Sequence, residues 1–379
     1  MGNIFDVIVL GLGAMGSAAA YHLASRRARV LGIEQFTSPH DKGSSHGGSR
    51  MIRQAYFESP SYIPLVLRSY DLWRKLESDF GAKLLHITGG LTLGASGGEL
   101  VSRTVAAARE HSVPLEMLDA AEVRRRFPAI MPLAGDTAVL EPYAGYLLPE
   151  ECVRAHLKLA AASGAQLHFE EKVLGWDAAR GSVKVRTSKQ TYEAGHLVIA
   201  AGPWANEATL DLFPLHVTRQ VMAWFAPRGG VAPFLPDRFP VFLMEEANGL
   251  PGYGFPALDG LAGGIKVAIH GSADVCTPAT VDRTIHARDI ERIRQKLAVR
   301  IPALEGELLR AQTCLYTMTP DEDFVIGTSP RTANCTVAAG FSGHGFKFSS
   351  VVGEVLADLA TTGTTSHPID IFDPIRFRG

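Results

Sequence analysis

The sequence predicts an α/β (α+β) protein of two domains, a Rossmann-like βαβ domain and a second domain built on a mixed sheet. Three observations lead to this prediction. The pattern of residues 5–34 predicts a strand, a glycine turn, a helix and a second strand. The segment from Leu215 to about Cys314 alternates short strands with Pro and Gly turns. The chain has 379 residues, which is longer than one hydrophobic core usually serves.

The N-terminal unit begins with the β-branched run FDVIVL, Phe5 to Leu10. A glycine-rich turn then leads into Ser17–Ala24, which is rich in helix formers, and a second apolar run, Val30–Ile33, ends at Glu34. Continuous apolar character in both strands is typical of a parallel sheet that is covered on both faces. The unit therefore predicts a doubly wound sheet.

The turn has the pattern Gly-x-Gly-x-x-Gly. Its glycines allow a tight turn, close approach of a pyrophosphate and packing of the helix on the strand. The helix N-terminus offers N–H groups to phosphates, and the acid after the second strand can accept from ribose hydroxyls. These observations do not decide whether the cofactor is FAD or NAD. The sequence contains only one such glycine fingerprint, which favours an oxidase or a quinone-linked dehydrogenase. The residues predicted to bind the dinucleotide are Gly11, Gly13, Ala14, Met15, Gly16 and Glu34.

Further elements follow from periodicity. The polar segment Pro39–Arg53, rich in Gly and Ser, shows neither helical nor strand spacing and is predicted to be a long functional loop. Amphipathic spacing predicts scaffold helices, and apolar runs bounded by turns predict strands. The predicted helices are Tyr62–Phe80, Glu150–Ala162, Asp289–Val299 and a last one from about Ser349 to Thr361, and the predicted strands are Gln166–Phe169, Ser182–Thr187, His196–Ala200, Gln220–Ala226, Gly252–Pro256, Gly264–His270 and Thr336–Ala339.

The domain assignment rests on where the chain returns to a glycine turn after a buried strand. This happens at Ala201-Gly202 and again at Gly340, where a cofactor can approach the backbone. Residues 1–83, 149–214 and 315–379 are therefore assigned to the cofactor domain, and residues 84–148 and 215–314 to the substrate domain.

Composition excludes several classes of protein. With 46% hydrophobic and 20% charged residues and a net charge of -2, the chain is not expected to be disordered or to bind nucleic acid. No apolar run is long enough to span a membrane, and a first strand at Phe5 leaves no room for a signal peptide, so a cytoplasmic location is expected. The cysteines form no CxxC pair, so neither a metal site nor a disulfide is expected. They are Cys152, Cys276, Cys314 and Cys335.

At several places the chain resembles the family of monomeric sarcosine oxidase and N-methyltryptophan oxidase. The resemblance is carried by VIVLGLGAMGSAAAYHLA, GSSHGGSRMIRQAY, CLYTMTPDEDFVIG and VAAGFSGHGFKFSSVVGEVLADLATTG, which occur in the same order at both ends of the chain. It implies a two-domain flavoprotein of the p-hydroxybenzoate-hydroxylase and glutathione-reductase type. Its expected properties are a covalently held FAD, oxidation of small N-methyl amino acids with O2 as acceptor, release of hydrogen peroxide, and a monomeric state.

The resemblance implies that Cys314 attaches the flavin at its 8α carbon. A thiolate is the nucleophile that this addition requires, and nearby positive charge favours the thiolate. From composition alone Cys314 is an inert core cysteine.

The resemblance also assigns the cations. Lys266 matches the lysine that activates oxygen, since a fixed cation stabilises the charge that develops on O2; strand alternation alone would make it a surface lysine. Arg53 and Lys347 match the residues that bind the substrate carboxylate, for which arginine offers a planar, bidentate clamp. Arg50 and His46 are expected beside the flavin ring, although a polar loop can also hold such residues in solvent.

Further matched residues complete the expected site. His270, Tyr253 and Tyr316 match active-site residues of the family, but each can equally serve a structural role. Ser44 and the run Gly343, His344, Gly345 and Phe346, with Lys347, are expected to contact the flavin. Sarcosine, N-methyltryptophan, pipecolate, proline or a glycated amino acid all fit these residues. Residues 241–253 depart from the family pattern and are expected to contact the variable group of the substrate. The alternative activity is an FAD dehydrogenase that delivers electrons to a quinone or a protein.

Overall fold

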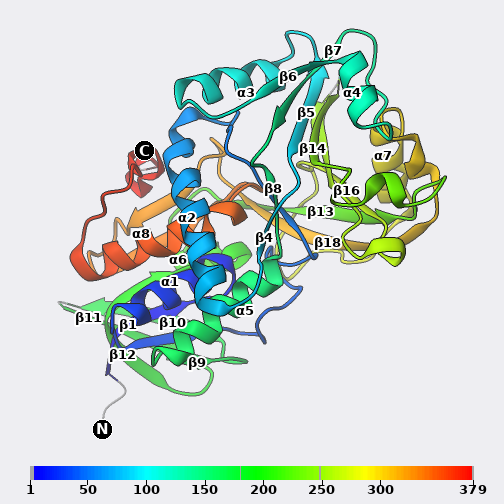
Figure 1. Cartoon of the computed structure of the whole chain (residues 1–379). Coiled ribbons are helices and arrows are strands. Elements are labelled where there is room, and N and C mark those ends of the chain that lie inside the picture. Colours follow the sequence, from blue (N-terminus) through cyan, green and yellow to red (C-terminus); the bar gives the residue numbers. More distant parts are fainter. Residues whose placement is uncertain (1–3, 180, 247–248, 378–379) are drawn as a thin grey trace.

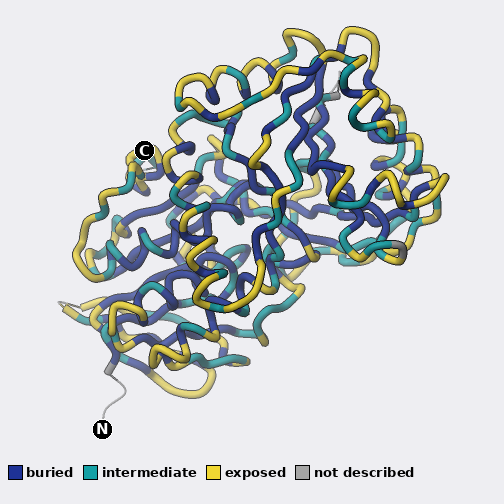
Figure 2. The backbone as a smooth tube through the Cα atoms, in the orientation of Figure 1, coloured by how far each residue is buried: buried dark blue, intermediate teal, exposed yellow. Residues whose placement is uncertain are grey.

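The computed structural model describes residues 4–179, 181–246 and 249–377. Two large sheets form its frame, one in the lower part and one in the upper right of Figure 1. Both are dark blue in Figure 2, because most of their strand residues are buried. A third, small sheet consists of β3 (Arg50–Ile52), β8 (Gly145–Leu147) and β4 (Leu85–Ile87).

The first sheet contains the predicted parallel strands of the βαβ unit. Its centre, β20-β12-β1-β2-β9, is parallel throughout, and β10, β11 and β19 add antiparallel strands. Both of its faces are buried under apolar side chains, as continuous apolar strands require. The strands are β1 (Ile4–Leu10), β2 (Val30–Ile33), β9 (Gln166–His168), β10 (Val173–Ala179), β11 (Ser182–Thr187), β12 (Thr191–Ile199), β19 (Val325–Thr328) and β20 (Cys335–Ala339).

The second sheet is mixed, as predicted. Its pairs are antiparallel except for β14 and β5, which run parallel. The register places Lys266 and Arg310 on either side of Trp224, and Cys314 opposite Gln220. The strands are β5 (Gly90–Ala95), β6 (Glu116–Asp119), β7 (Asp136–Glu141), β13 (His216–Phe225), β14 (Val241–Glu246), β15 (Gly249–Phe255), β16 (Ile265–Ile269), β17 (Val275–Cys276) and β18 (Leu308–Met318).

Helices cover one face of the first sheet and flank the second. In Figure 1, α1, α2, α5 and α8 lie together at the centre, and α3, α4 and α7 surround the second sheet. The α-helices are α1 (Ala14–Ser25), α2 (Ile63–Phe80), α3 (Glu99–Glu110), α4 (Ala120–Arg126), α5 (Pro149–Ala162), α6 (Ala205–Thr209), α7 (Ala287–Leu297) and α8 (Ser349–Thr362). The four predicted scaffold helices are confirmed to within two residues at each end, and the helix predicted at Ser17–Ala24 begins three residues earlier, at Ala14.

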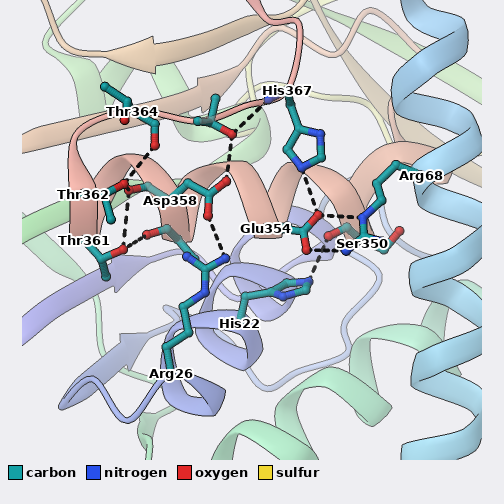
Figure 3. A network of polar contacts seen from close by, with 12 residues as sticks. His22, Arg26, Arg68, Ser350, Glu354, Asp358, Thr361, Thr362, Thr364 and His367 are labelled. Atoms are coloured by element: carbon teal, nitrogen blue, oxygen red, sulfur yellow. Dashed lines mark hydrogen bonds and ion pairs between the residues drawn. The ribbon is translucent and has the colours of Figure 1, made fainter.

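A polar network ties α8 to α1, α2 and the C-terminal segment (Figure 3). Glu354 on α8 accepts hydrogen bonds from Arg68 on α2 at 2.9 and 2.7 Å, and its Oε2 lies 2.9 Å from His367 Nε2. Arg26, at the end of α1, pairs with Asp358 at 2.7 Å. Burial raises the pKa of Glu354, but its hydrogen bonds with Arg68 and His367 outweigh burial and lower it. The network holds the helix that follows Lys347.

The structure differs from the sequence predictions in several places, and three of them have a clear physical reason. The predicted loop Pro39–Arg53 contains the short strand β3, which pairs with β8. Strand β12 begins at Thr191 rather than His196, because its first residues pair with β11. β18 was not predicted, since it is an edge strand that pairs only with β13 among the described strands and its first half mixes polar with apolar residues. The predicted domain limit between residues 314 and 315 falls inside β18, and the division into domains stays a proposal.

We predict that Gly353→Ala lowers the free energy of unfolding by about 1–3 kcal/mol, the usual cost of overpacking. A Cβ at Gly353 would lie 2.5 Å from Ala18 Cβ and 2.6 Å from the Ala18 carbonyl carbon, so α8 must move away from α1. Urea unfolding followed by circular dichroism measures the change. Thr361→Ala, at an exposed position of α8, is the control and is expected to stay within about 0.5 kcal/mol. Equal stability of the two variants would contradict the prediction.

Candidate active site

One cavity runs along the carboxyl ends of the parallel strands and continues toward the second sheet. Leu10 at the end of β1, Ile33 at the end of β2 and Ala338 near the end of β20 all line it. At its other end it is lined by Leu243, Tyr253 and further residues of the second sheet. Ligands of open α/β sheets bind in the crevice at the carboxyl ends of the strands, so this cavity is the candidate site.

The glycine turn forms one end of the cavity. A Cβ at Gly16 would lie 1.8 Å from the carbonyl oxygen of Gly11, so only glycine allows α1 to pack this closely on the turn. Glu34 accepts hydrogen bonds from Leu12 N at 2.9 Å and from Phe36 N at 3.1 Å. Burial raises the pKa of Glu34 in spite of these bonds. The turn, the start of α1 and a buried acid are arranged as a dinucleotide site requires.

Several apolar side chains at this end of the cavity are exposed to solvent. Leu174 is 59% exposed and Leu210 is 50% exposed, yet both line the cavity, together with Trp176 and Trp204. Apolar surface that gathers at a cavity is typical of a site for a flat organic ligand. These residues fit the adenine half of a dinucleotide.

Cys314 lies on β18 and lines the middle of the cavity. Arg50 Nη2 is 3.5 Å from its sulfur, and the same nitrogen donates to the Ser44 carbonyl oxygen at 2.8 Å. Burial acts to raise the pKa of Cys314, but the charge of Arg50, with weaker contributions from His46 and Lys266, outweighs burial and lowers it to about 7. A substantial fraction of the thiol is therefore ionised at neutral pH.

Lys266 lies on β16 and is only 2% exposed, so it is not a surface lysine. Its Nζ donates to the carbonyl oxygens of Gly47 and Ser49, both at 2.8 Å. The Nζ also lies 4.7 Å from the ring centroid of Phe255 and 5.4 Å from that of Trp224. Burial, followed by the charge of Arg50, lowers the pKa of Lys266 well below its ordinary value. Lys266 thus holds the backbone of the loop that carries Arg50.

Arg53 and Lys347 form a pair of buried cations at the second end of the cavity. Arg53 Nη2 donates to both carboxylate oxygens of Glu58 at 2.7 and 2.6 Å, and Lys347 Nζ donates to the His344 carbonyl oxygen at 2.9 Å. Burial and the charge of Arg53 lower the pKa of Lys347 to about 7. Burial alone would raise the pKa of Glu58, but Arg53 lowers it, so Glu58 is ionised. The two cations are suited to bind a carboxylate.

Aromatic side chains line the same end. The Tyr316 hydroxyl lies 3.5 Å from His270 Nδ1, and the ring of Tyr253 lies 6.3 Å from that of His270. Burial lowers the pKa of His270 to about 4, so the imidazole is neutral at pH 7. Burial raises the pKa of both tyrosines. This end is therefore a largely apolar pocket with a few hydroxyl and imidazole groups.

Most of the predicted site residues line this cavity, and three lie behind its wall. Gly16 is beneath the glycine turn, and Lys266 contacts the loop of Arg50 from behind. His46 is 2% exposed, and neither of its ring nitrogens has a hydrogen-bond partner in the described part of the chain. The predicted residues that line the cavity are Gly11, Gly13, Ala14, Met15, Glu34, Ser44, Arg50, Arg53, Tyr253, His270, Cys314, Tyr316, Gly343, His344, Gly345, Phe346 and Lys347.

Sequence reasoning missed two acids of the site. Glu58 binds Arg53, and Glu150 at the start of α5 accepts from Gly47 N at 2.6 Å and Gly48 N at 3.1 Å. Glu58 follows Arg53 by five positions in a segment without periodicity, which is a weak signal. Glu150 is far away in the sequence and gives no local signal at all. Of the segment expected to contact the variable group, Leu243 and Tyr253 line the cavity, whereas residues 247–248 lie outside the described part of the chain.

No helix within residues 4–179, 181–246 and 249–377 is long and apolar enough to cross a membrane. In the same ranges, no group of three or more His, Cys, Asp or Glu residues is arranged to hold a metal ion.

The model of the FAD-dependent oxidoreductase family matches residues 6–359. The chain belongs to this family. It is 50% identical over 378 residues to a monomeric sarcosine oxidase of Streptomyces avermitilis, with 99% of this chain and 98% of that protein covered. It is 33% identical to an N-methyl-L-tryptophan oxidase of Yersinia pestis, with 99% and 100% covered. The cofactor of this family member is FAD, which decides between the two dinucleotides that the glycine pattern left open.

Solved structures share the fold. NikD, described as an unusual amino acid oxidase essential for nikkomycin biosynthesis, superposes with a TM-score of 0.86 at 27% sequence identity and covers 98% of this chain and 97% of its own. An L-proline dehydrogenase from P. horikoshii superposes with a TM-score of 0.85 at 26% identity, with 100% and 99% covered. The predicted fold class and the predicted family are therefore confirmed.

We predict that alkylation of Cys314 by iodoacetamide, in protein produced without flavin, speeds up as the pH rises through about 7, because the thiolate is the nucleophile. Peptide mass spectrometry measures the rate. Arg50→Met is expected to move the midpoint toward the ordinary value of about 8.5. Cys152 and Cys335, whose pKa values burial raises, are internal controls that stay unmodified. A midpoint near 8.5 in the unaltered protein would contradict the assignment.

Proposed function

We propose that this protein oxidises small N-methyl amino acids such as sarcosine to imines and reduces O2 to H2O2. The observation that carries the proposal is that two buried cations, Arg53 and Lys347, border the same cavity as Cys314 and the aromatic pocket. An amino acid offers a carboxylate to the cations and a small N-alkyl group to the pocket. The 50% identity to a protein named monomeric sarcosine oxidase supports the same conclusion.

FAD, when bound, accepts the hydride equivalent that leaves the carbon next to nitrogen. Two electrons and two protons leave the amine in the overall reaction and reduce one O2, and water then hydrolyses the imine. The residues proposed to hold FAD are Gly11, Gly13, Ala14, Met15, Gly16, Glu34, Ser44, His46, Arg50, Gly343, His344, Gly345, Phe346 and Lys347, with a covalent thioether at Cys314.

The substrate is proposed to bind as the neutral amine. Arg50, Arg53 and Lys347 border the cavity, and their positive charge disfavours an ammonium group there. The amine therefore loses its proton to solvent on binding, and no side chain has to act as a general base. The substrate carboxylate competes with Glu58 for the guanidinium of Arg53. His270, neutral at pH 7, is able to hydrogen-bond the amine or the imine.

Lys266 is proposed to act in the second half of the reaction. A buried ammonium group stabilises the negative charge that develops on oxygen as it is reduced, and this effect is strong where water is excluded. Arg50 is the nearest alternative cation, since it borders the cavity beside Cys314.

Oxygen uptake with peroxide detection tests the proposed function. Sarcosine is expected to give the largest kcat/KM among sarcosine, N-methyl-L-tryptophan, pipecolate, proline and a glycated amino acid. A larger kcat/KM for one of the other amines would make that amine the preferred substrate and leave the proposed reaction unchanged. Flavin reduction by an amine without peroxide formation would instead favour the dehydrogenase, and no flavin reduction by any of them would contradict an amine oxidoreductase.

We predict that yellow colour stays with the polypeptide after acid precipitation, and that Cys314→Ser leaves FAD extractable or absent. Among the cysteines that the structure describes, only Cys314 both lines the cavity and has a lowered pKa. Absorbance of the pellet and the supernatant measures the distribution. Cys276→Ser, outside the cavity, is the control. Quantitative loss of flavin from the unaltered protein rules out covalent attachment.

Arg53→Met is predicted to raise the dissociation constant of the amino acid roughly ten- to a hundredfold, because a buried hydrogen bond to a charged group contributes about 1.5–3 kcal/mol. Anaerobic flavin reduction at increasing substrate concentration measures this constant. Arg125→Met, on the exposed side of α4, is the matched control and is expected to have no effect. An unchanged affinity in the Arg53 variant would refute its role in substrate binding.

Lys266→Met is predicted to slow the reaction of reduced enzyme with O2 by orders of magnitude and to slow anaerobic reduction much less. Methionine keeps most of the apolar stem but removes the charge that is needed only after reduction. Stopped-flow absorbance separates the two half-reactions. Lys347→Met is expected to show the opposite asymmetry, with weaker reduction and normal reoxidation. If the Lys266→Met variant is fully loaded with flavin and still reoxidises at the normal rate, Arg50 becomes the candidate for the cation that promotes the reaction with O2.

A further inference from the structure

Both cations of the proposed carboxylate site lie over one aromatic ring. Arg53 Cζ is 4.4 Å from the ring centroid of Tyr56, and Lys347 Nζ is 5.0 Å from the same centroid. Tyr56 itself is fully buried and does not line the cavity. Two like charges that share one ring repel each other, and the negative π face of the ring offsets part of this repulsion.

The ring is held in place from several sides. Tyr62 stacks on it at 4.9 Å between ring centroids, and Phe348 meets it edge-on at 5.2 Å. The Tyr56 hydroxyl lies 2.6 Å from His344 Nδ1, and His344 Nε2 lies 3.1 Å from the Glu322 carbonyl oxygen. Since a carbonyl only accepts, Nε2 carries the hydrogen and Nδ1 accepts from the hydroxyl of Tyr56.

His344 links the ring to Lys347 as well. Its carbonyl oxygen accepts from Lys347 Nζ at 2.9 Å, while its side chain fixes the hydroxyl of Tyr56. Burial lowers the pKa of His344 to about 3, so its imidazole stays neutral and adds no third positive charge. The position of the ring and the position of the ammonium group are therefore set by the same residue.

We propose that Tyr56 is the positioning residue of the carboxylate site. Its π face holds Arg53 and Lys347 side by side without using up their N–H donors, whereas an acid such as Glu58 both neutralises the guanidinium and occupies its donors. The cations remain directed at a carboxylate in the cavity when Glu58 releases Arg53. This inference rests on the proposed function, since it presupposes that the two cations bind a carboxylate.

The test compares an acid with its neutral counterpart. Calorimetric titration of the FAD-loaded enzyme with propionate and with propionamide gives two dissociation constants, of which only the first depends on the cations. Tyr56→Leu is expected to weaken propionate binding roughly ten- to thirtyfold, the loss of two desolvated cation–π contacts, and to leave propionamide within about twofold. Tyr56→Phe keeps the ring and is expected to bind propionate within about threefold of the unaltered enzyme.

Each outcome has a defined meaning. Equal weakening of propionate and propionamide by Tyr56→Leu, or no weakening of either, overturns the inference. If the leucine variant does not load FAD, Tyr56→Met fills the space without a π face and takes its place. Arg53→Met and Lys347→Met test the underlying site. If they also bind propionate normally, the proposed carboxylate site itself is wrong. If only these two lose propionate binding, the site stands and the role of Tyr56 alone is refuted.

Discussion

The burial of several cations in and beside one crevice is the constraint on which the site depends. Lys266, Arg53 and Lys347 are each at most 6% exposed. A buried charge without partners costs several kcal/mol, so each cation needs compensation within reach. Carbonyl oxygens of the 47–49 segment compensate Lys266, the carboxylate of Glu58 compensates Arg53, and the carbonyl oxygen of His344 compensates Lys347. The backbone of these segments cannot move without leaving a charge unpaired.

The same charges supply the chemistry that is proposed for the site. Positive potential lowers the pKa of Cys314 to about 7, attracts a carboxylate and favours a neutral amine over an ammonium group. Burial, together with the charge of Arg53, lowers the pKa of Lys347 to about 7, so this cation is close to losing its own charge. Aromatic faces help to hold the cations without neutralising them, as at Tyr56, Phe255 and Trp224. Stability and reactivity at this site thus have one electrostatic origin.

Local patterns predicted the frame of the protein well, because helix and strand periodicity and the glycine turn are properties of short segments. The turn at Gly11 to Gly16, the acid at Glu34 and the helices α2, α5 and α8 all follow from spacing that the structure confirms. Strand β18 was missed because it is an edge strand whose first half lacks clear alternation. The short strand β3 was missed because it exists only where β8 pairs with it.

What the sequence alone determined is the fold class, the dinucleotide turn, the family and the set of residues proposed to act. Only the tertiary structure decided which of these residues meet. Residues from 44–58, 253–270, 314–316 and 343–347 converge on one cavity, although none of these segments encodes that convergence locally. Hydrogen bonds and ring contacts that depend on tertiary packing connect three further residues to the site, namely Glu58, Glu150 and Tyr56. Charge, burial and pKa depend on distances across the fold, and spacing along the chain does not specify them.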